Sequence, residues 1–269
     1  MGLRTSLIIP TLGDRIPELT RLFDSLTTQT NADIELIVVA QDNHSAVKEL
    51  CDLYSDRLSV KCCLIEKKGL SLARNAGLKY VSGDVLVLAD DDCWYRSNSI
   101  EHIAGFFENN PDADILLTQI YDPEQGVQYK NYSKKRAIIT RRTELLSRSS
   151  IEIAVRMKAP IIEFDEAFGL GAKYASGEDN DYLIRALKER KKIYYEHVVT
   201  VLHRKKPYIE SREQVIAKGA FYSKHMGFIV SNAVLLRDLI QKHQNNYRWF
   251  WFGYFDYKKI QSRREEIGG

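Results

Sequence analysis

Three consecutive carboxylates follow a short apolar run that is typical of a buried strand. The run is Val85–Leu88, and the carboxylates are Asp90, Asp91 and Asp92. Neighbouring carboxylates repel one another, and folding alone gives no reason to place three of them here. A divalent cation such as Mg²⁺ or Mn²⁺ removes the repulsion, because it prefers oxygen ligands and can share them with substrate phosphates. The alternative is a solvated acidic turn that caps the next helix, and the triplet alone does not decide between the two.

A second acidic cluster, Gly177-Glu178-Asp179-Asn180-Asp181, opens a predicted helix. A carboxylate at this place can act as a general base if it reaches the hydroxyl that it deprotonates. Acidic residues in a first helical turn are also ordinary capping, since the helix macrodipole favours negative charge there. Taken alone, the cluster favours capping.

A single histidine, His203, ends the last predicted strand, Ile193–Leu202, and Arg204-Lys205-Lys206 follow it. A lone histidine is usually structural or simply exposed. At a strand end, its neutral imidazole is a candidate third metal ligand, and the adjacent cations can approach phosphate.

The elements that position these residues alternate between strand and helix. The expected strands are Leu7–Ile9 (ended by Pro10), Ile34–Val39, Val60–Ile65 and Val85–Leu88, and the expected helices cover residues 19–26, 47–54 and 70–81. This rhythm predicts an α/β fold with a mainly parallel central sheet flanked by helices. Ligands bind beyond the carboxyl ends of strands in such sheets. Pro10-Thr11, Gln41-Asp42 and Asp90–Asp92 all lie at such ends.

The C-terminal part is expected to be helical from about Ser211 to His243. The chain then continues into an aromatic segment, Trp249–Phe255, with basic neighbours. We therefore expect a domain over residues 1–206 and a helical C-terminal extension over residues 207–269. Aromatic and basic residues together are typical of a membrane-interface contact. The same aromatics can equally cap the core or form a dimer interface.

Composition excludes several classes of protein. The formal net charge is +3, with 28% charged residues, which argues against a nucleic-acid partner because a dedicated binder carries a larger, clustered basic excess. The N-terminus lacks the pattern of a signal peptide, and no apolar run reaches the ~20 residues needed to cross a bilayer. The expected location is cytoplasmic, with a possible peripheral contact at the inner face of the membrane.

The order and spacing of the motifs resemble glycosyltransferase family 2, the inverting transferases with the GT-A nucleotide-diphospho-sugar fold. The resemblance runs from about Leu7 to His203. The motifs that carry it are Ile8-Ile9-Pro10-Thr11, Gly69–Gly77 with its Ala73-Arg74-Asn75, Gly83-Asp84, Leu88–Asp92, Phe164-Asp165-Glu166 and Gly177-Glu178-Asp179.

The resemblance implies a role for each matching residue. Pro10 and Thr11 would line the nucleotide pocket, and Arg74 would lie against the base or the diphosphate. The acidic triplet would match the D-x-D motif, with Asp90 near the ribose, Asp91 beside it in the donor site, and Asp92 binding Mn²⁺ or Mg²⁺. His203 would complete the metal ligands. Asp179 would be the base, although Glu178 and Asp181 are close enough in sequence to take that role.

One segment departs from the family pattern. Relatives often have two aspartates after the second strand, where this chain has Ala40-Gln41-Asp42-Asn43. Asp42 or Gln41 is therefore the candidate for reading the base, and a base other than uracil stays open.

The implied reaction transfers a sugar from a nucleotide-sugar donor, with UDP the first choice, to a hydroxyl of a glycan or a lipid-linked saccharide. Assembly of bacterial surface polysaccharide is the implied setting. A nucleotidyltransferase is an alternative, but Leu12-Gly13-Asp14-Arg15 has too few glycines for its phosphate loop. A catalytically silent module that binds sugar nucleotides or glycans is the second alternative.

Overall fold

The computed structural model describes residues 2–30, 33–158, 160–207, 209–242 and 247–268. The strands are β1 (Thr5–Thr11), β2 (Ile34–Ala40), β3 (Ser59–Leu64), β4 (Val85–Leu88), β5 (Trp94–Tyr95), β6 (Ile115–Asp122), β7 (Val127–Gln128), β8 (Ala137–Ile139), β9 (Ile153–Arg156) and β10 (Ile193–Leu202). The α-helices are α1 (Ile16–Thr27), α2 (His44–Tyr54), α3 (Leu70–Leu78), α4 (Ser99–Asn109), α5 (Glu178–Lys188), α6 (Arg212–His225), α7 (Gly227–Lys242) and α8 (Tyr247–Gly268). Two 3₁₀ turns, η1 (Arg142–Leu145) and η2 (Ser150–Glu152), precede β9.

These strands form one central sheet in the order β3-β2-β1-β4-β9-β6-β10-β5. In addition, β7 pairs with β6, and β8 pairs with β10. β1 to β4 pair in parallel, and so do β6 and β10. β9 runs antiparallel between β4 and β6. The α/β fold with a mainly parallel sheet is thus confirmed, and the antiparallel strands were not expected.

Both faces of the sheet are buried. Side chains alternate along a strand, so Leu7 and Ile9 of β1 pack with helices α1, α2 and α4, whereas Ile8 packs in the core that contains α3, α5, α6 and α8. A strand buried on both sides is apolar throughout, which is why β1, β2 and β4 were recognisable as continuous runs.

The prediction that Pro10 ends the first strand is wrong. β1 continues to Thr11, and Pro10 pairs with Val39 of β2. On the other side of β1, the pairing with β4 ends at Ile8. Proline lacks an N–H and is tolerated where no ladder hydrogen bond is needed. The extension carries Thr11 to the edge of the functional site.

The helical region expected from about Ser211 to His243 consists of two helices. α6 ends at His225 and α7 begins at Gly227, whose φ of +72° is a left-handed conformation that favours glycine. His243 lies outside the described residues. Likewise, the third predicted helix ends at Leu78 rather than at residue 81.

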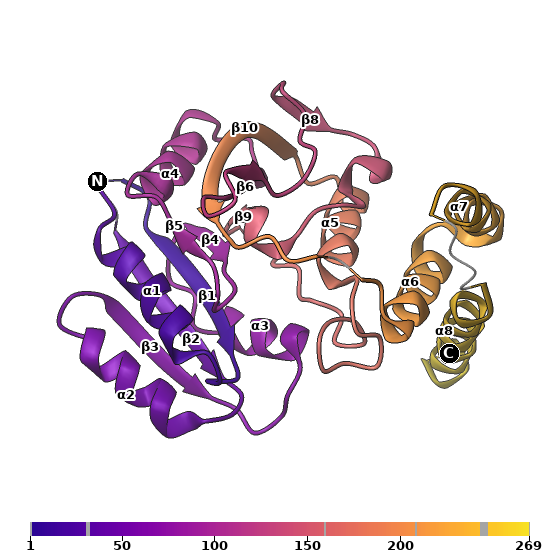
Figure 1. The fold of residues 1–269 in the computed structure, drawn as a ribbon, viewed down its shortest axis with the longest axis horizontal. Coiled ribbons are helices and arrows are strands. Elements are labelled where there is room, and N and C mark those ends of the chain that lie inside the picture. Colours follow the sequence, from indigo (N-terminus) through magenta and orange to yellow (C-terminus); the bar gives the residue numbers. More distant parts are fainter. Residues whose placement is uncertain (1, 31–32, 159, 208, 243–246, 269) are drawn as a thin grey trace.

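The helices α6, α7 and α8 lie together at the opposite side of the molecule from β1–β3 (Figure 1). α6 and α8 approach closely, because Gly219 faces the Phe250 carbonyl and Gly253 faces the Ile216 carbonyl, where a Cβ atom would overlap the backbone. Their apolar residues belong to the same core as α3 and α5. The domain boundary near residue 207 stays a prediction. Within the described residues, no helix is both long and apolar enough to span a membrane.

Candidate functional site

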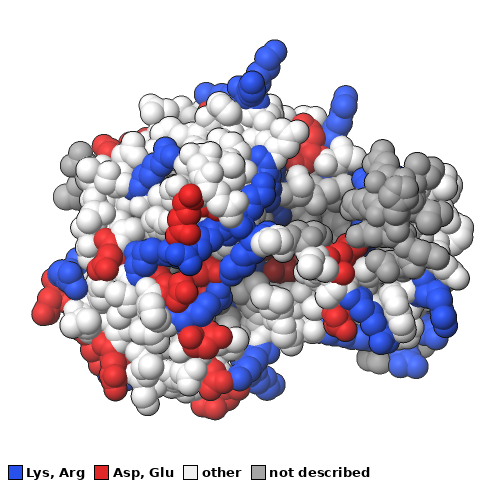
Figure 2. All heavy atoms as spheres, in the orientation of Figure 1, with Lys and Arg blue, Asp and Glu red and all other residues white. Residues whose placement is uncertain are grey.

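A pocket of about 430 Å³ opens at the carboxyl ends of β1, β2, β4 and β10. It contains most of the residues that the sequence singled out: Pro10, Thr11, Gln41, Asp90, Asp91, Asp92 and His203. Acidic and basic side chains gather side by side near the middle of the face drawn in Figure 2. Residues that are 193 positions apart in the chain, from Pro10 to His203, therefore meet at one edge of the sheet.

The middle carboxylate of the triplet points into the protein. Asp91 is 3% exposed; its Oδ2 accepts a hydrogen bond of 2.7 Å from Thr11 Oγ1, and its Oδ1 lies 2.6 Å from Arg15 Nη2. Burial raises the pKa of Asp91 to about 6, against the opposing effects of Thr11 and Arg15. Asp91 therefore ties the acidic turn to the end of β1.

Asp92 faces the pocket and is surrounded by nitrogen atoms. His203 Nε2 lies 3.0 Å from Asp92 Oδ1, and Lys206 Nζ lies 3.2 Å from Oδ2, which also pairs with Arg15 Nη1. Burial opposes ionisation, but the contact with His203 and the charges around it hold the pKa of Asp92 well below its usual range. Asp92 is thus an anion at neutral pH, next to an imidazole.

A fully buried arginine connects the acidic turn to the second acidic cluster. The Arg74 side chain is 1% exposed; its Nη2 lies 3.3 Å from Asp90 Oδ1, and its Nη1 lies 3.0 Å from Asp179 Oδ1 and 3.9 Å from Glu178 Oε1. The predicted contact of Arg74 with base or diphosphate stays a prediction. In the structure, the guanidinium holds three carboxylates in one place.

Asp179 and Glu178, in the first turn of α5, have different environments. Asp179 accepts hydrogen bonds on both oxygens, from Arg74 at Oδ1 and from the Ser150 backbone N–H at Oδ2, 2.9 Å away. Glu178 is buried, and burial together with the nearby charge of Asp179 raises its pKa well above the usual range. Burial therefore disfavours the ionised form of Glu178, whereas Asp179 has both carboxylate oxygens held by hydrogen bonds.

Asp181, the third candidate base, points away from this cluster. Its side chain is fully buried and contacts His225 Nε2 at 2.8 Å, Arg185 Nε at 2.8 Å and Lys224. These contacts join α5 to α6. The geometry therefore favours a structural role for Asp181.

Gln41 and Asp42, at the end of β2, have different surroundings. Gln41 lines the pocket, and its Oε1 accepts a hydrogen bond of 2.7 Å from the Gly69 N–H. Asp42 is half exposed and pairs with Lys68, which also lines the pocket. The Gln41 carbonyl is thus committed to the chain, which leaves its amide NH₂ group as the part able to read a base.

Two cations of the pocket, Arg15 and Lys68, were not singled out by the sequence as site residues, whereas Leu170 and Gly171 belong to a glycine-rich loop that was expected to let substrate approach the backbone. Gly171 has a φ of +78°, and a Cβ atom there would lie 3.3 Å from the Cα of Gly69. This close approach of two loops closes one wall of the pocket. The sequence signal for these two cations was their position alone: Arg15 follows β1, and Lys68 precedes α3.

The donor atoms at the predicted metal site have suitable chemistry. Asp90 and Asp92 supply oxygens and His203 supplies a nitrogen, a set that Mn²⁺ or Mg²⁺ accepts. Among the described residues, however, no group of three or more histidine, cysteine or acidic side chains converges into a metal site. Arg15 and Lys206 contact the carboxylate of Asp92 instead.

The fold is that of the GT-A nucleotide-diphospho-sugar transferases. The structure of S. aureus TarS 1–349 in complex with UDP superposes with a TM-score of 0.65 at 18% identity, over 91% of this chain and 74% of that one. The corresponding complex with UDP-GlcNAc gives a TM-score of 0.63 at 19% identity, over 90% of this chain and 72% of that one.

Sequence comparison assigns the family. The model of glycosyl transferase family 2 matches residues 6–162, more than half of the chain, and the chain belongs to this family. It is 32% identical over 131 residues to the uncharacterized glycosyltransferase YwdF of Bacillus subtilis, a match that covers 47% of each protein. It is 29% identical to the minor teichoic acid biosynthesis protein GgaB of the same organism, over 44% of this chain and 14% of GgaB. The matches thus span less than half of these relatives.

Proposed function

We propose that this protein transfers a sugar from a UDP-sugar to a hydroxyl group of a glycan or lipid-linked acceptor, with inversion at the anomeric carbon. The observation that carries the proposal is the ion-pair chain from Asp90, which lines the pocket, through the buried Arg74 to Asp179, the candidate base. The family and a neighbour titled as a UDP-GlcNAc complex support the class of donor.

Asp179 is the group suited to take the proton from the acceptor hydroxyl. Its two oxygens are fixed by Arg74 and by Ser150, so its remaining lone pairs have a defined direction. The raised pKa of Glu178 disfavours its ionised form, and the carboxylate of Asp181 is enclosed by cations, so both are less suited to this role. In a single displacement, Asp179 accepts the proton while the acceptor oxygen bonds to carbon 1 and the diphosphate leaves.

The opposite side of the pocket is suited to the leaving group. Lys206 is 66% exposed and Arg15 is 41% exposed, and both cations can reach a diphosphate. Asp90, Asp92 and His203 would hold Mn²⁺ or Mg²⁺. When bound, this ion neutralises the charge that develops on the diphosphate.

The first test is turnover of a panel of nucleotide sugars with and without Mn²⁺, comparing the wild type with Asp92→Ala. We expect metal-dependent release of one nucleoside diphosphate, reduced on the order of 10²-fold or more in the variant, because a metal ligand is lost. NMR of the product checks inversion. Donors that bind and never react, even with mixed acceptors, would favour the silent binding module. Release of pyrophosphate would favour a nucleotidyltransferase.

We also propose a peripheral membrane contact through α8, suited to a lipid-linked acceptor. Phe250, Tyr254 and Tyr257 of α8 are buried and cap the core, so only part of the aromatic segment is available. Phe252 is 57% exposed and Phe255 is 49% exposed, and Lys258 and Lys259 follow them on the same helix. Exposed aromatics beside cations suit an anionic bilayer surface.

The membrane proposal predicts that Phe252→Ser/Phe255→Ser weakens binding to phosphatidylglycerol-containing vesicles by on the order of tenfold, because two apolar anchors are lost. A truncation is unsuitable, since it would remove the buried Phe250 and Tyr254. Leu53→Ser is the matched control, because Leu53 is 68% exposed on α2. Vesicle sedimentation measures the effect. Equal binding of both variants would show that α8 does not contact the membrane.

A further inference from the structure

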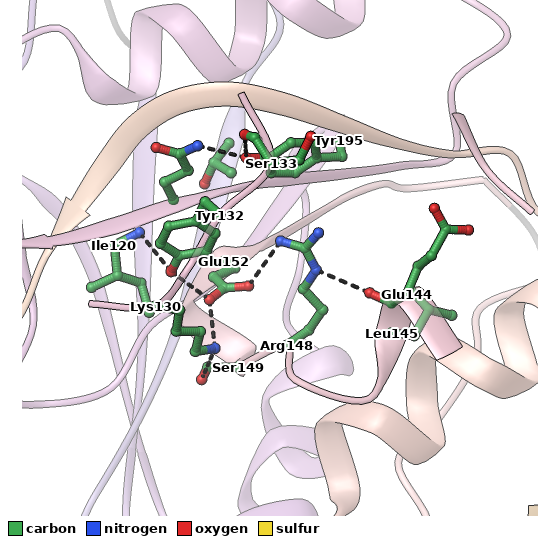
Figure 3. A network of polar contacts seen from close by, with 12 residues as sticks. Ile120, Lys130, Tyr132, Ser133, Glu144, Leu145, Arg148, Ser149, Glu152 and Tyr195 are labelled. Atoms are coloured by element: carbon green, nitrogen blue, oxygen red, sulfur yellow. Dashed lines mark hydrogen bonds and ion pairs between the residues drawn. The ribbon is translucent and has the colours of Figure 1, made fainter. Parts of the chain in front are cut away.

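Glu152 is a buried carboxylate outside the predicted site. Three side chains of the irregular segment between β6 and β9 contact it. The Glu152 side chain is fully buried. Its Oε1 accepts hydrogen bonds from Lys130 Nζ at 2.6 Å and from Tyr132 Oη at 2.8 Å, and its Oε2 lies 3.5 Å from Arg148 Nη1 (Figure 3). One anion thus binds two cations.

These contacts fix the segment against the sheet. The Tyr132 hydroxyl also accepts a hydrogen bond of 3.1 Å from the Ile120 N–H of β6. The Arg148 guanidinium lies 4.6 Å from the centre of the Tyr195 ring of β10. Removal of the Glu152 charge would leave two partly buried cations without their shared anion, which is an unfavourable arrangement.

The same segment holds the candidate base. Lys130 Nζ donates a hydrogen bond of 2.6 Å to Ser149 Oγ, and the next residue, Ser150, donates its N–H to Asp179 Oδ2. The Asn180 side chain donates to the carbonyls of Leu145 and Arg148. The first turn of α5 is therefore docked on the turn that Glu152 organises.

Lys130 connects the two carboxylates electrostatically. Burial lowers the pKa of Lys130, and the negative charges of Glu152 and Asp179 oppose that effect. Asp179 is therefore an alternative partner for the Lys130 ammonium if Glu152 is neutral.

We propose that Glu152 is a positioning residue for Asp179: it binds the Lys130 ammonium and fixes the Ser149–Ser150 turn, so that Asp179 stays free to accept the acceptor proton. This role rests on the proposed transferase function. It assigns a catalytic consequence to a residue that lies outside the pocket and contacts Asp179 only through its neighbours.

The test compares Glu152→Gln with the double variant Lys130→Met/Glu152→Gln. In the single variant Lys130 is free to pair with Asp179, and we expect kcat to fall by on the order of 10-fold to 10²-fold with donor KM within about twofold. The double variant removes the freed cation, and we expect it to recover kcat by roughly tenfold. A purely structural role predicts that the double variant is no better than the single one.

Glu35→Gln is the matched control. Glu35 is 12% exposed and binds Arg4 Nη2 at 3.3 Å, with Ser6 and Ser82, at the opposite ends of the strands. Its loss should lower stability without changing kcat. If Glu152→Gln does not fold, Tyr132→Phe, which removes one donor from Glu152 and no charge, should still lower kcat by about twofold to fivefold. Unchanged kcat in the folded variant would overturn the proposal.

A crystal structure of Glu152→Gln provides a readout that needs no turnover. We expect Lys130 Nζ within about 4 Å of an Asp179 oxygen. If Lys130 and Asp179 keep their places, the positioning role is wrong even where wild-type transfer is established. If the wild type transfers no sugar but Lys130 moves as expected, the transferase proposal fails and the coupling of the two carboxylates stands.

Discussion

Replacement of Asp179 by asparagine is expected to lower kcat for sugar transfer by on the order of 10²-fold to 10⁴-fold, with donor affinity within about threefold of the wild type. Asparagine keeps the size of the side chain, and its carbonyl oxygen can still accept the hydrogen bond from Arg74 Nη1. It cannot take a proton from the acceptor hydroxyl. The variant is therefore expected to slow the chemical step and to leave donor binding intact. Calorimetry with UDP measures the binding, and steady-state transfer kinetics measure kcat.

Asp181→Asn is the matched control for this prediction. Asp181 lies in the same helical turn, but its carboxylate binds Arg185, Lys224 and His225 and not Arg74, the partner of Asp179. Its replacement should lower the thermal stability and leave kcat near the wild-type value below the melting temperature. A greater loss of kcat in Asp181→Asn than in Asp179→Asn would reverse the assignment of the base.

Much of the fold was predictable because β1, β2 and β4 are buried on both faces. Their apolar runs are followed by polar residues, so the sequence predicted that Thr11, Gln41 and Asp90–Asp92 lie at one edge of the sheet, as they do in the pocket. The antiparallel strand β9 was not predictable. It has only four residues and follows an irregular segment, so no periodicity distinguishes it from a loop.

The connections within the site were harder to predict than its members. Arg74 appeared in the sequence as part of a motif, but its contact with Asp179, 105 residues away, depends on how α3 and α5 meet across the same face of the sheet. Glu152 gave no signal, since a single glutamate in an irregular stretch is ordinary. Its importance is visible only when Lys130, Tyr132 and Arg148 are brought to it by tertiary structure.

The same dependence on tertiary structure makes the stability of the fold sensitive to Arg74. Arg74→Met is expected to lower the free energy of unfolding by about 3–5 kcal/mol at neutral pH. It leaves Asp90, Asp179 and Glu178 without their shared cation. For a chain of this size, the melting temperature should fall by on the order of 10 °C. Arg4→Met is the matched control, because Arg4 is 38% exposed and its pairs lie near the surface.

The pH dependence identifies the cause of this loss. Without Arg74, the nearby carboxylates in the folded state would have pKa values above those of the unfolded chain, as burial and Asp179 already cause for Glu178. A group with a raised folded pKa loses its stabilising contribution as the pH rises through that pKa. The stability deficit of Arg74→Met relative to the wild type should therefore be smaller at pH 5 than at pH 8, as measured by urea unfolding at both values. An equal deficit at the two pH values would mean that lost packing, rather than uncompensated negative charge, causes the instability.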